Sequence, residues 1–176
     1  MANERNRTLQ ALQIAIQMEI DGKEYYMKAS QKSSNELGKK LLQSLATEED
    51  THRQNYQEIY DAIRSKKAWP VTGFQPDSGK RLRTVFAAAT EAAGADVKAL
   101  ETELDAVQTA IDMESKTCDF YESQRENATY DAERDFYQTL AAEEREHHLI
   151  MLDYYEYLKD QAGWFVRKEH PSLDGG

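Results

Sequence analysis

The sequence has few residues that form disulfides or interrupt helices, and it has no long apolar stretch that could span a membrane. Its 176 residues include one cysteine, Cys118, which excludes an intrachain disulfide and any zinc or iron–sulfur site built from paired cysteines. Three prolines and eight glycines leave room for long, uninterrupted helices. No stretch approaches the roughly 18 apolar residues that span a membrane, so we expect no membrane partner. The N-terminal residues lack the apolar core of a signal peptide, and we therefore expect a reducing, cytoplasmic location.

Basic residues are also in short supply. The chain has 22 Lys and Arg against 32 Asp and Glu, which gives a formal net charge of −10. Because nucleic-acid phosphates require a basic face, we expect no nucleic-acid partner. A length of 176 residues with 40% hydrophobic residues is sufficient for one globular domain with its own core.

Four long segments have the apolar periodicity of amphipathic helices. They span approximately residues 5–31, 35–66, 96–126 and 131–160. Three polar residues at their starts are predicted N-caps: Asn35, Asp96 and Asp131. The links after the first and third segments are short, so each pair of segments is predicted to form an antiparallel hairpin.

The proline- and glycine-containing region lies between the two predicted hairpins. It covers about residues 68–95, includes a predicted short helix at about 80–93, and is long enough to run the length of a bundle. We therefore predict an all-α, antiparallel four-helix bundle over residues 1–162, with this region as a long crossover inside it. Residues 163–176 are predicted to be a C-terminal tail that is not a recognisable further helix.

The two predicted hairpins are copies of one another. Ala15-Ile-Gln-Met-Glu19 resembles Ala110-Ile-Asp-Met-Glu114, and Glu48-Glu49-Asp-Thr-His52 resembles Glu143-Glu144-Arg-Glu-His147. Both matches have the same offset of 95 residues. One offset held across two helices and their link indicates that the whole hairpin is duplicated.

Each of the four apolar helix faces is interrupted by a glutamate at the same level. Burying an unpaired carboxylate costs several kcal/mol, and four of them converging in a core would repel one another. Two divalent cations would neutralise four carboxylates, whereas one would leave an excess of negative charge. A histidine three residues after two of these glutamates lies on the same helix face and supplies a nitrogen ligand. The predicted metal-binding and catalytic residues are Glu19, Glu49, His52, Glu114, Glu144 and His147.

Carboxylate oxygens with one imidazole per ion favour iron, with manganese or zinc as possible substitutes. Glutamates beside this set but off the apolar faces are predicted to be solvated surface residues: Glu48, Glu143 and Glu146. Cys118 is predicted to fill core space and not to bind metal. Three tyrosines lie one or two helical turns from the predicted ligands: Tyr26, Tyr56 and Tyr121. Their spacing fits either of two roles. They could pack in the core, or they could donate a hydrogen bond to a metal ligand or relay electrons.

Taken together, these motifs resemble the rubrerythrin branch of the ferritin-like superfamily, and the resemblance extends over nearly the whole chain. It implies a ferritin-like fold with two irons. Glu49 and Glu144 would bridge the irons, Glu19 and Glu114 would be terminal ligands, and each iron would have one histidine. The implied activity is that of a non-haem di-iron oxidoreductase acting in oxidative stress, which reduces hydrogen peroxide or dioxygen. A ferroxidase and a non-catalytic, metal-stabilised bundle acting through partners are the alternatives.

Two features depart from this family pattern. Full-length rubrerythrins carry a rubredoxin-like domain whose iron is held by four cysteines, whereas this sequence has only Cys118. Electrons would therefore come from an external donor, such as a rubredoxin-like protein, or from added Fe(II). Ile111 stands where those proteins place an extra glutamate, three residues before the ligand on the third bundle helix. A homodimer is also expected from the resemblance.

Overall fold

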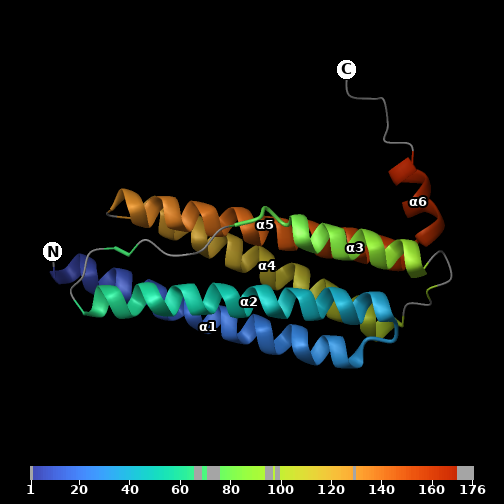
Figure 1. Ribbon diagram of the computed structural model, residues 1–176, viewed down its shortest axis with the longest axis horizontal. Coiled ribbons are helices and arrows are strands. Elements are labelled where there is room, and N and C mark those ends of the chain that lie inside the picture. The colour runs from blue at the N-terminus through green and yellow to red at the C-terminus, as the bar shows by residue number, and fades with distance from the viewer. Residues whose placement is uncertain are drawn as a thin grey trace, which may run out of the picture.

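The protein is a bundle of four long helices with two shorter helices attached (Figure 1). The computed structural model describes residues 2–65, 69–70, 76–93, 97, 100–128 and 130–169, and the side chains from residue 5 to residue 167. The helices are α1 (Ala2–Lys32), α2 (Glu36–Arg64), α3 (Lys80–Ala93), α4 (Glu101–Asn127), α5 (Asp131–Lys159) and α6 (Gln161–Glu169). The described part of the chain contains no strand and no helix both long and apolar enough to cross a membrane. The prediction of an all-α, ferritin-like bundle is confirmed.

The long helices pair as two hairpins, α1 with α2 and α4 with α5. Asn35 is the N-cap of α2, as predicted, and its side-chain oxygen accepts a hydrogen bond from the Gly38 N–H at 2.8 Å. The predicted N-cap at Asp131 is wrong, because Tyr130 has the extended backbone of the cap and Asp131 is already helical. In that first turn the Asp131 carboxylate still interacts favourably with the helix dipole. Asp96 lies outside the described residues, and α4 begins after the N-cap Leu100.

The crossover between the hairpins contains α3, which has the predicted bounds and lies against both α2 and α5 (Figure 1). The turn that leads into α3 has left-handed backbone at Ser78 (φ 55°) and Gly79 (φ 69°). Glycine adopts such a φ without the steric cost that other residues incur. The turn brings the backbone of the crossover close to α5, where the Ser78 N–H donates a hydrogen bond to Glu143.

A layer of carboxylates and imidazoles divides the apolar core into two clusters. On α2, Leu45 belongs to one cluster and Tyr56 to the other, with Glu49 and His52 between them in the sequence. On α5, Leu140 and Met151 flank the polar layer in the same way. The polar layer therefore lies in the middle of the bundle, with packed side chains on both sides.

The C-terminal segment differs from the prediction, because it contains the short helix α6. Trp164 is buried there, with its ring centroid 5.6 Å from that of Phe86 on α3 and 5.5 Å from that of Tyr157 on α5. Nine residues are too few to give a clear helical period. The helix is held by this aromatic packing, which a sequence pattern does not reveal. Residues 170–176 lie outside the described residues.

Candidate metal centre

All six predicted ligands are buried in the middle layer of the bundle. Glu19 comes from α1, Glu49 and His52 from α2, Glu114 from α4, and Glu144 and His147 from α5. They form two groups in which the potential ligand atoms all lie within 4.8 Å of one another. The first group is Glu19, Glu49, His52 and Glu144, and the second is Glu49, Glu114, Glu144 and His147. Glu49 and Glu144 belong to both groups, whereas each group has one glutamate and one histidine of its own.

Both histidines present their Nδ1 atoms to the carboxylates. Nδ1 of His147 lies 3.2 Å from Glu49 Oε1, 3.4 Å from Glu144 Oε2 and 3.7 Å from Glu114 Oε2. Nδ1 of His52 lies 3.3 Å from Glu144 Oε1 and 3.5 Å from Glu19 Oε2. The two imidazole rings are nearly parallel, with their centroids 5.6 Å apart. Each ring therefore directs one nitrogen towards a cluster of carboxylate oxygens.

Burial and mutual repulsion strongly perturb the ionisation of this layer. Burial raises the pKa of Glu49 well above its usual range, and the charges of Glu19 and Glu144 raise it further. Burial also raises the pKa of Glu114, to about 7. For Glu144, burial favours the neutral carboxyl, but His147 and His52 outweigh it and hold the pKa well below the usual range. The pKa values of both histidines are raised because the surrounding carboxylates outweigh the effect of burial.

Several of these polar atoms, although close to oppositely charged groups, make no hydrogen bond of good geometry among the described residues. These buried atoms are Glu19 Oε2, Glu49 Oε1, both carboxylate oxygens of Glu144 and His147 Nδ1. Buried polar atoms in native proteins are nearly always hydrogen-bonded, since an unsatisfied one costs about 1–3 kcal/mol. Coordination by divalent cations would satisfy these atoms and balance the carboxylate charge. The oxygen-rich donor set with imidazole nitrogens fits a two-metal centre and suits iron or manganese.

Two buried tyrosines each hold a glutamate of the opposite hairpin. The Tyr26 hydroxyl on α1 donates a hydrogen bond to Glu114 Oε1, and the Tyr121 hydroxyl on α4 donates one to Glu19 Oε1. Burial, together with nearby carboxylates, raises the pKa of both phenols well above the usual range, so the two tyrosines remain hydrogen-bond donors. Tyr56 instead stacks on His52, with ring centroids 6.2 Å apart. The hydrogen-bonding alternative for Tyr26 and Tyr121 therefore agrees with the structure.

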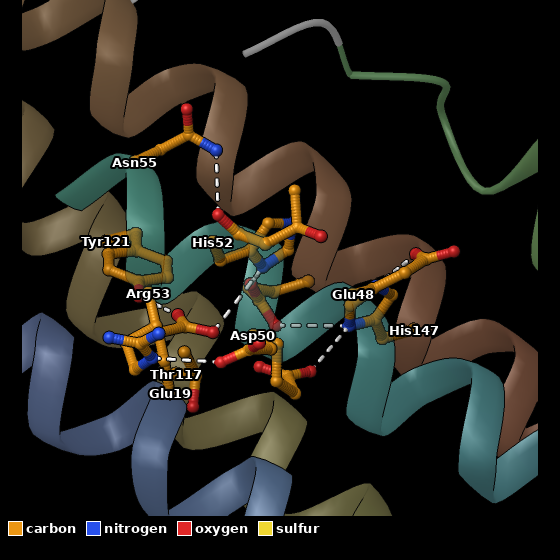
Figure 2. A network of polar contacts seen from close by, with 12 residues as sticks. Glu19, Glu48, Asp50, His52, Arg53, Asn55, Thr117, Tyr121 and His147 are labelled. Carbon is orange, nitrogen blue, oxygen red and sulfur yellow. Dashed lines mark hydrogen bonds and ion pairs between the residues drawn. The ribbon is translucent and has the colours of Figure 1, made fainter. Parts of the chain in front are cut away.

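The prediction that Glu48 and Glu143 are solvated is wrong. Glu48 Oε2 lies 3.1 Å from His147 Nε2, and its side chain is only 13% exposed (Figure 2). Glu143 is buried and accepts a hydrogen bond from the Ser78 N–H at 3.0 Å. The crossover covers both residues, which helical periodicity alone does not indicate. One available signal was the repeat itself, because Glu48 and Glu143 are related by the same 95-residue offset as the ligands.

Glu146 and Cys118 lie beside the two ligand groups. Glu146 is only partly solvated, with its side chain 20% exposed, and it forms an ion pair with Arg83 of α3. Cys118 belongs to neither ligand group. Its Sγ contacts the Ala141 carbonyl oxygen at 3.5 Å, and its side chain packs beside the second core cluster. Burial raises the pKa of this thiol.

Comparison with known proteins gives one family match. Residues 10–100 match the family model described as Rubrerythrin, which is slightly more than half of the chain. The matched segment contains Glu19, Glu49 and His52, whereas the second half of the ligand set lies beyond it. Neither the curated proteins nor the solved structures give a match.

Proposed function

The chain belongs to the rubrerythrin family, and from this premise we propose that it is a non-haem di-iron oxidoreductase that reduces hydrogen peroxide. The observation that carries the proposal is the pair of buried ligand groups that share Glu49 and Glu144. These two glutamates would bridge the metal ions. Glu19 with His52, and Glu114 with His147, would complete the two positions.

The chemistry has simple requirements. Reduction of one hydrogen peroxide to two water molecules consumes two electrons and two protons. When bound, two ferrous ions would supply one electron each as they are oxidised to ferric ions. The 176-residue chain has one cysteine, so it cannot form a four-cysteine rubredoxin-type iron site. We propose that the electrons return from a site outside these 176 residues, such as the iron site of a rubredoxin-like protein.

The protein's own residues would hold and shield this centre. Tyr121 and Tyr26 each bind one oxygen of Glu19 and Glu114, respectively, which leaves the second oxygen directed towards a histidine nitrogen. The apolar clusters on both sides of the layer exclude bulk water from the bundle interior. A low-dielectric environment of this kind strengthens the attraction between the carboxylates and bound cations.

One observation favours a ferroxidase as the second candidate. Ile111 is buried on α4, one turn before Glu114, and adds no carboxylate to the ligand set. The two ligand groups therefore have the same composition, three glutamates and one histidine each. A symmetric centre of this kind suits iron that is oxidised there and then passed on as a substrate.

Rapid mixing of the anaerobic ferrous protein separates these functions. We expect oxidation to be much faster with hydrogen peroxide than with dioxygen, and one peroxide to be consumed for each pair of irons. Sustained turnover of a large excess of Fe(II) with dioxygen would favour the ferroxidase instead. A loaded protein that reacts with neither oxidant would overturn both and favour the non-catalytic, metal-stabilised bundle.

A further inference from the structure

Glu48 and Glu143 occupy equivalent positions in the two hairpins, each one residue before a glutamate shared by both ligand groups. Their contacts nevertheless differ. Glu48, on α2, lies against His147 of α5 and so links one hairpin to the other. Glu143, on α5, binds the backbone of the crossover at Ser78. Glu48 is not a member of either ligand group, although it touches a residue that is.

We infer that Glu48 is a positioning residue that orients His147 for metal binding. This inference rests on the proposed metal centre. His147 is fully buried, and its Nδ1 already faces three carboxylates. The only other polar atom of the ring is Nε2, which lies 3.1 Å from Glu48 Oε2 (Figure 2).

The position of Glu48 determines which nitrogen of His147 is available as a ligand. A carboxylate accepts hydrogen bonds and cannot donate them when ionised. In the neutral imidazole that binds a metal, Nε2 would then carry the proton, which leaves the Nδ1 lone pair directed at the carboxylate layer. Contacts of this kind fix the tautomer and the ring orientation of metal-binding histidines, and their loss typically lowers metal affinity about 10–100-fold.

Glu48 also has a charged neighbour in the crossover. Arg81 lies in the first turn of α3, and its Nε is 3.9 Å from Glu48 Oε1. The other carboxylate oxygen remains directed at His147. The crossover helix, the first hairpin and the second hairpin thus meet at this carboxylate. Through Arg81, α3 thus lies next to the carboxylate that contacts His147.

A purely structural ion pair is the competing explanation, and zinc binding separates the two. Zinc is a diamagnetic probe, so its affinity can be measured by chelator competition and the imidazole N–H proton can be followed by NMR in the loaded protein. We expect Glu48→Ala to weaken one of the two zinc equivalents about 10–100-fold. It should also remove the slowly exchanging N–H signal of His147, because that proton loses its acceptor.

Two further variants serve as rescue and control. Glu48→Gln keeps an oxygen that can accept from Nε2, so it should retain the N–H signal and most of the affinity. Glu146→Ala is the matched control, because Glu146 immediately precedes His147 and pairs with Arg83 of the same crossover helix. It removes an ion pair to α3 without touching the His147 ring, and should leave both measurements unchanged.

The outcomes distinguish this inference from the proposed function. Wild-type protein that binds fewer than two zinc ions would argue against the two-metal centre itself. Wild-type binding of two ions, with Glu48→Ala equal to wild type in both affinity and N–H signal, would overturn the role of Glu48 alone. If Glu48→Ala does not fold, Glu48→Asp replaces it, because aspartate withdraws the carboxylate by one methylene group. Glu48→Asp should then show a smaller loss of the same kind, and wild-type behaviour would again overturn the inference.

Discussion

Replacing Glu114, one of the predicted metal ligands, by glutamine is expected to stabilise the metal-free protein at neutral pH. Burial raises the pKa of the Glu114 carboxyl from an ordinary value of 4.5 to about 7. Between these two pH values the folded state keeps a proton that the unfolded state releases. The folded state therefore binds more protons, and the contribution of Glu114 makes stability fall as the pH rises from 4.5 to 7.

The size of the effect follows from the width of this pH window. One pKa unit corresponds to 1.36 kcal/mol, so Glu114 lowers the stability of the metal-free protein at pH 7 by about 3 kcal/mol. Glutamine does not titrate, and its side-chain oxygen can still accept the hydrogen bond from Tyr26. Glu114→Gln should therefore raise the melting temperature at pH 7 by about 6–12 °C for a domain of this size. Near pH 4.5 the gain should be almost gone, because Glu114 is then protonated in the folded state and already half protonated in the unfolded state.

Thermal and urea unfolding with a chelator present, from pH 4.5 to 8, measures this difference. Asp119→Asn on the exposed side of α4 is the control, and it should change stability by less than about 0.5 kcal/mol at every pH. With Fe(II) or Zn²⁺ in place of the chelator, the order should reverse, since wild type gains binding energy that Glu114→Gln largely loses. A Glu114→Gln variant that is less stable than wild type without metal at pH 7 would refute the reasoning.

Three other predictions concern packing, a thiol and protons. Gly38→Ala should cost about 2–4 kcal/mol in urea unfolding, because the new Cβ would lie 2.9 Å from Glu103 Oε1 and disturb its buried hydrogen bonds. Gly22→Ala should be neutral or stabilising by up to about 1 kcal/mol, because the new Cβ would lie at an ordinary distance of 3.5 Å from its nearest neighbour, Glu49 Oε2. Equal stability of the Gly38→Ala and Gly22→Ala variants would contradict this account. Cys118 should react with iodoacetamide more slowly than a free thiol at pH 8, because burial raises the pKa of its thiol. The reaction should become faster only at higher pH. Rapid alkylation at pH 7 would be inconsistent with the burial of Cys118. Metal binding at pH 6–7 should release protons, because the pKa values of the Glu49 and Glu114 carboxyls are raised in the metal-free protein. Calorimetry in buffers of different ionisation enthalpy measures this release. If no protons are released, these carboxyls are already ionised and the account is wrong.

The gathering of the six predicted ligands in the core was predictable, because charged residues stand at helix positions where the apolar periodicity calls for hydrophobic ones. Glu49 and Glu144 interrupt apolar faces, and a single offset of 95 residues relates them. The bounds of α3 were also predictable, since Gly79 before it and Gly94 after it in the sequence enclose one amphipathic segment. For α3 the local sequence pattern and the tertiary environment favour the same residues.

Helical periodicity alone did not predict the other buried carboxylates, because their partners come from distant parts of the chain. Glu103 accepts hydrogen bonds from Ser33 and Asn35, about 70 residues away in the sequence. Glu48 and Glu146 look alike as surface glutamates on long helices. The packing of one hairpin against the other determines that Glu48 meets a histidine, and the path of the crossover determines that Glu146 meets Arg83.

The central claim is that the buried layer binds two metal ions, and counting metal in Glu144→Ala tests it most directly. Glu144 belongs to both ligand groups. Wild-type protein loaded anaerobically with Fe(II) and then desalted should retain about two irons per chain, as in other di-metal carboxylate bundles. Glu144→Ala with unchanged helical circular dichroism should retain almost none. Equal iron content in the two proteins, or a wild-type protein without iron, would contradict the account.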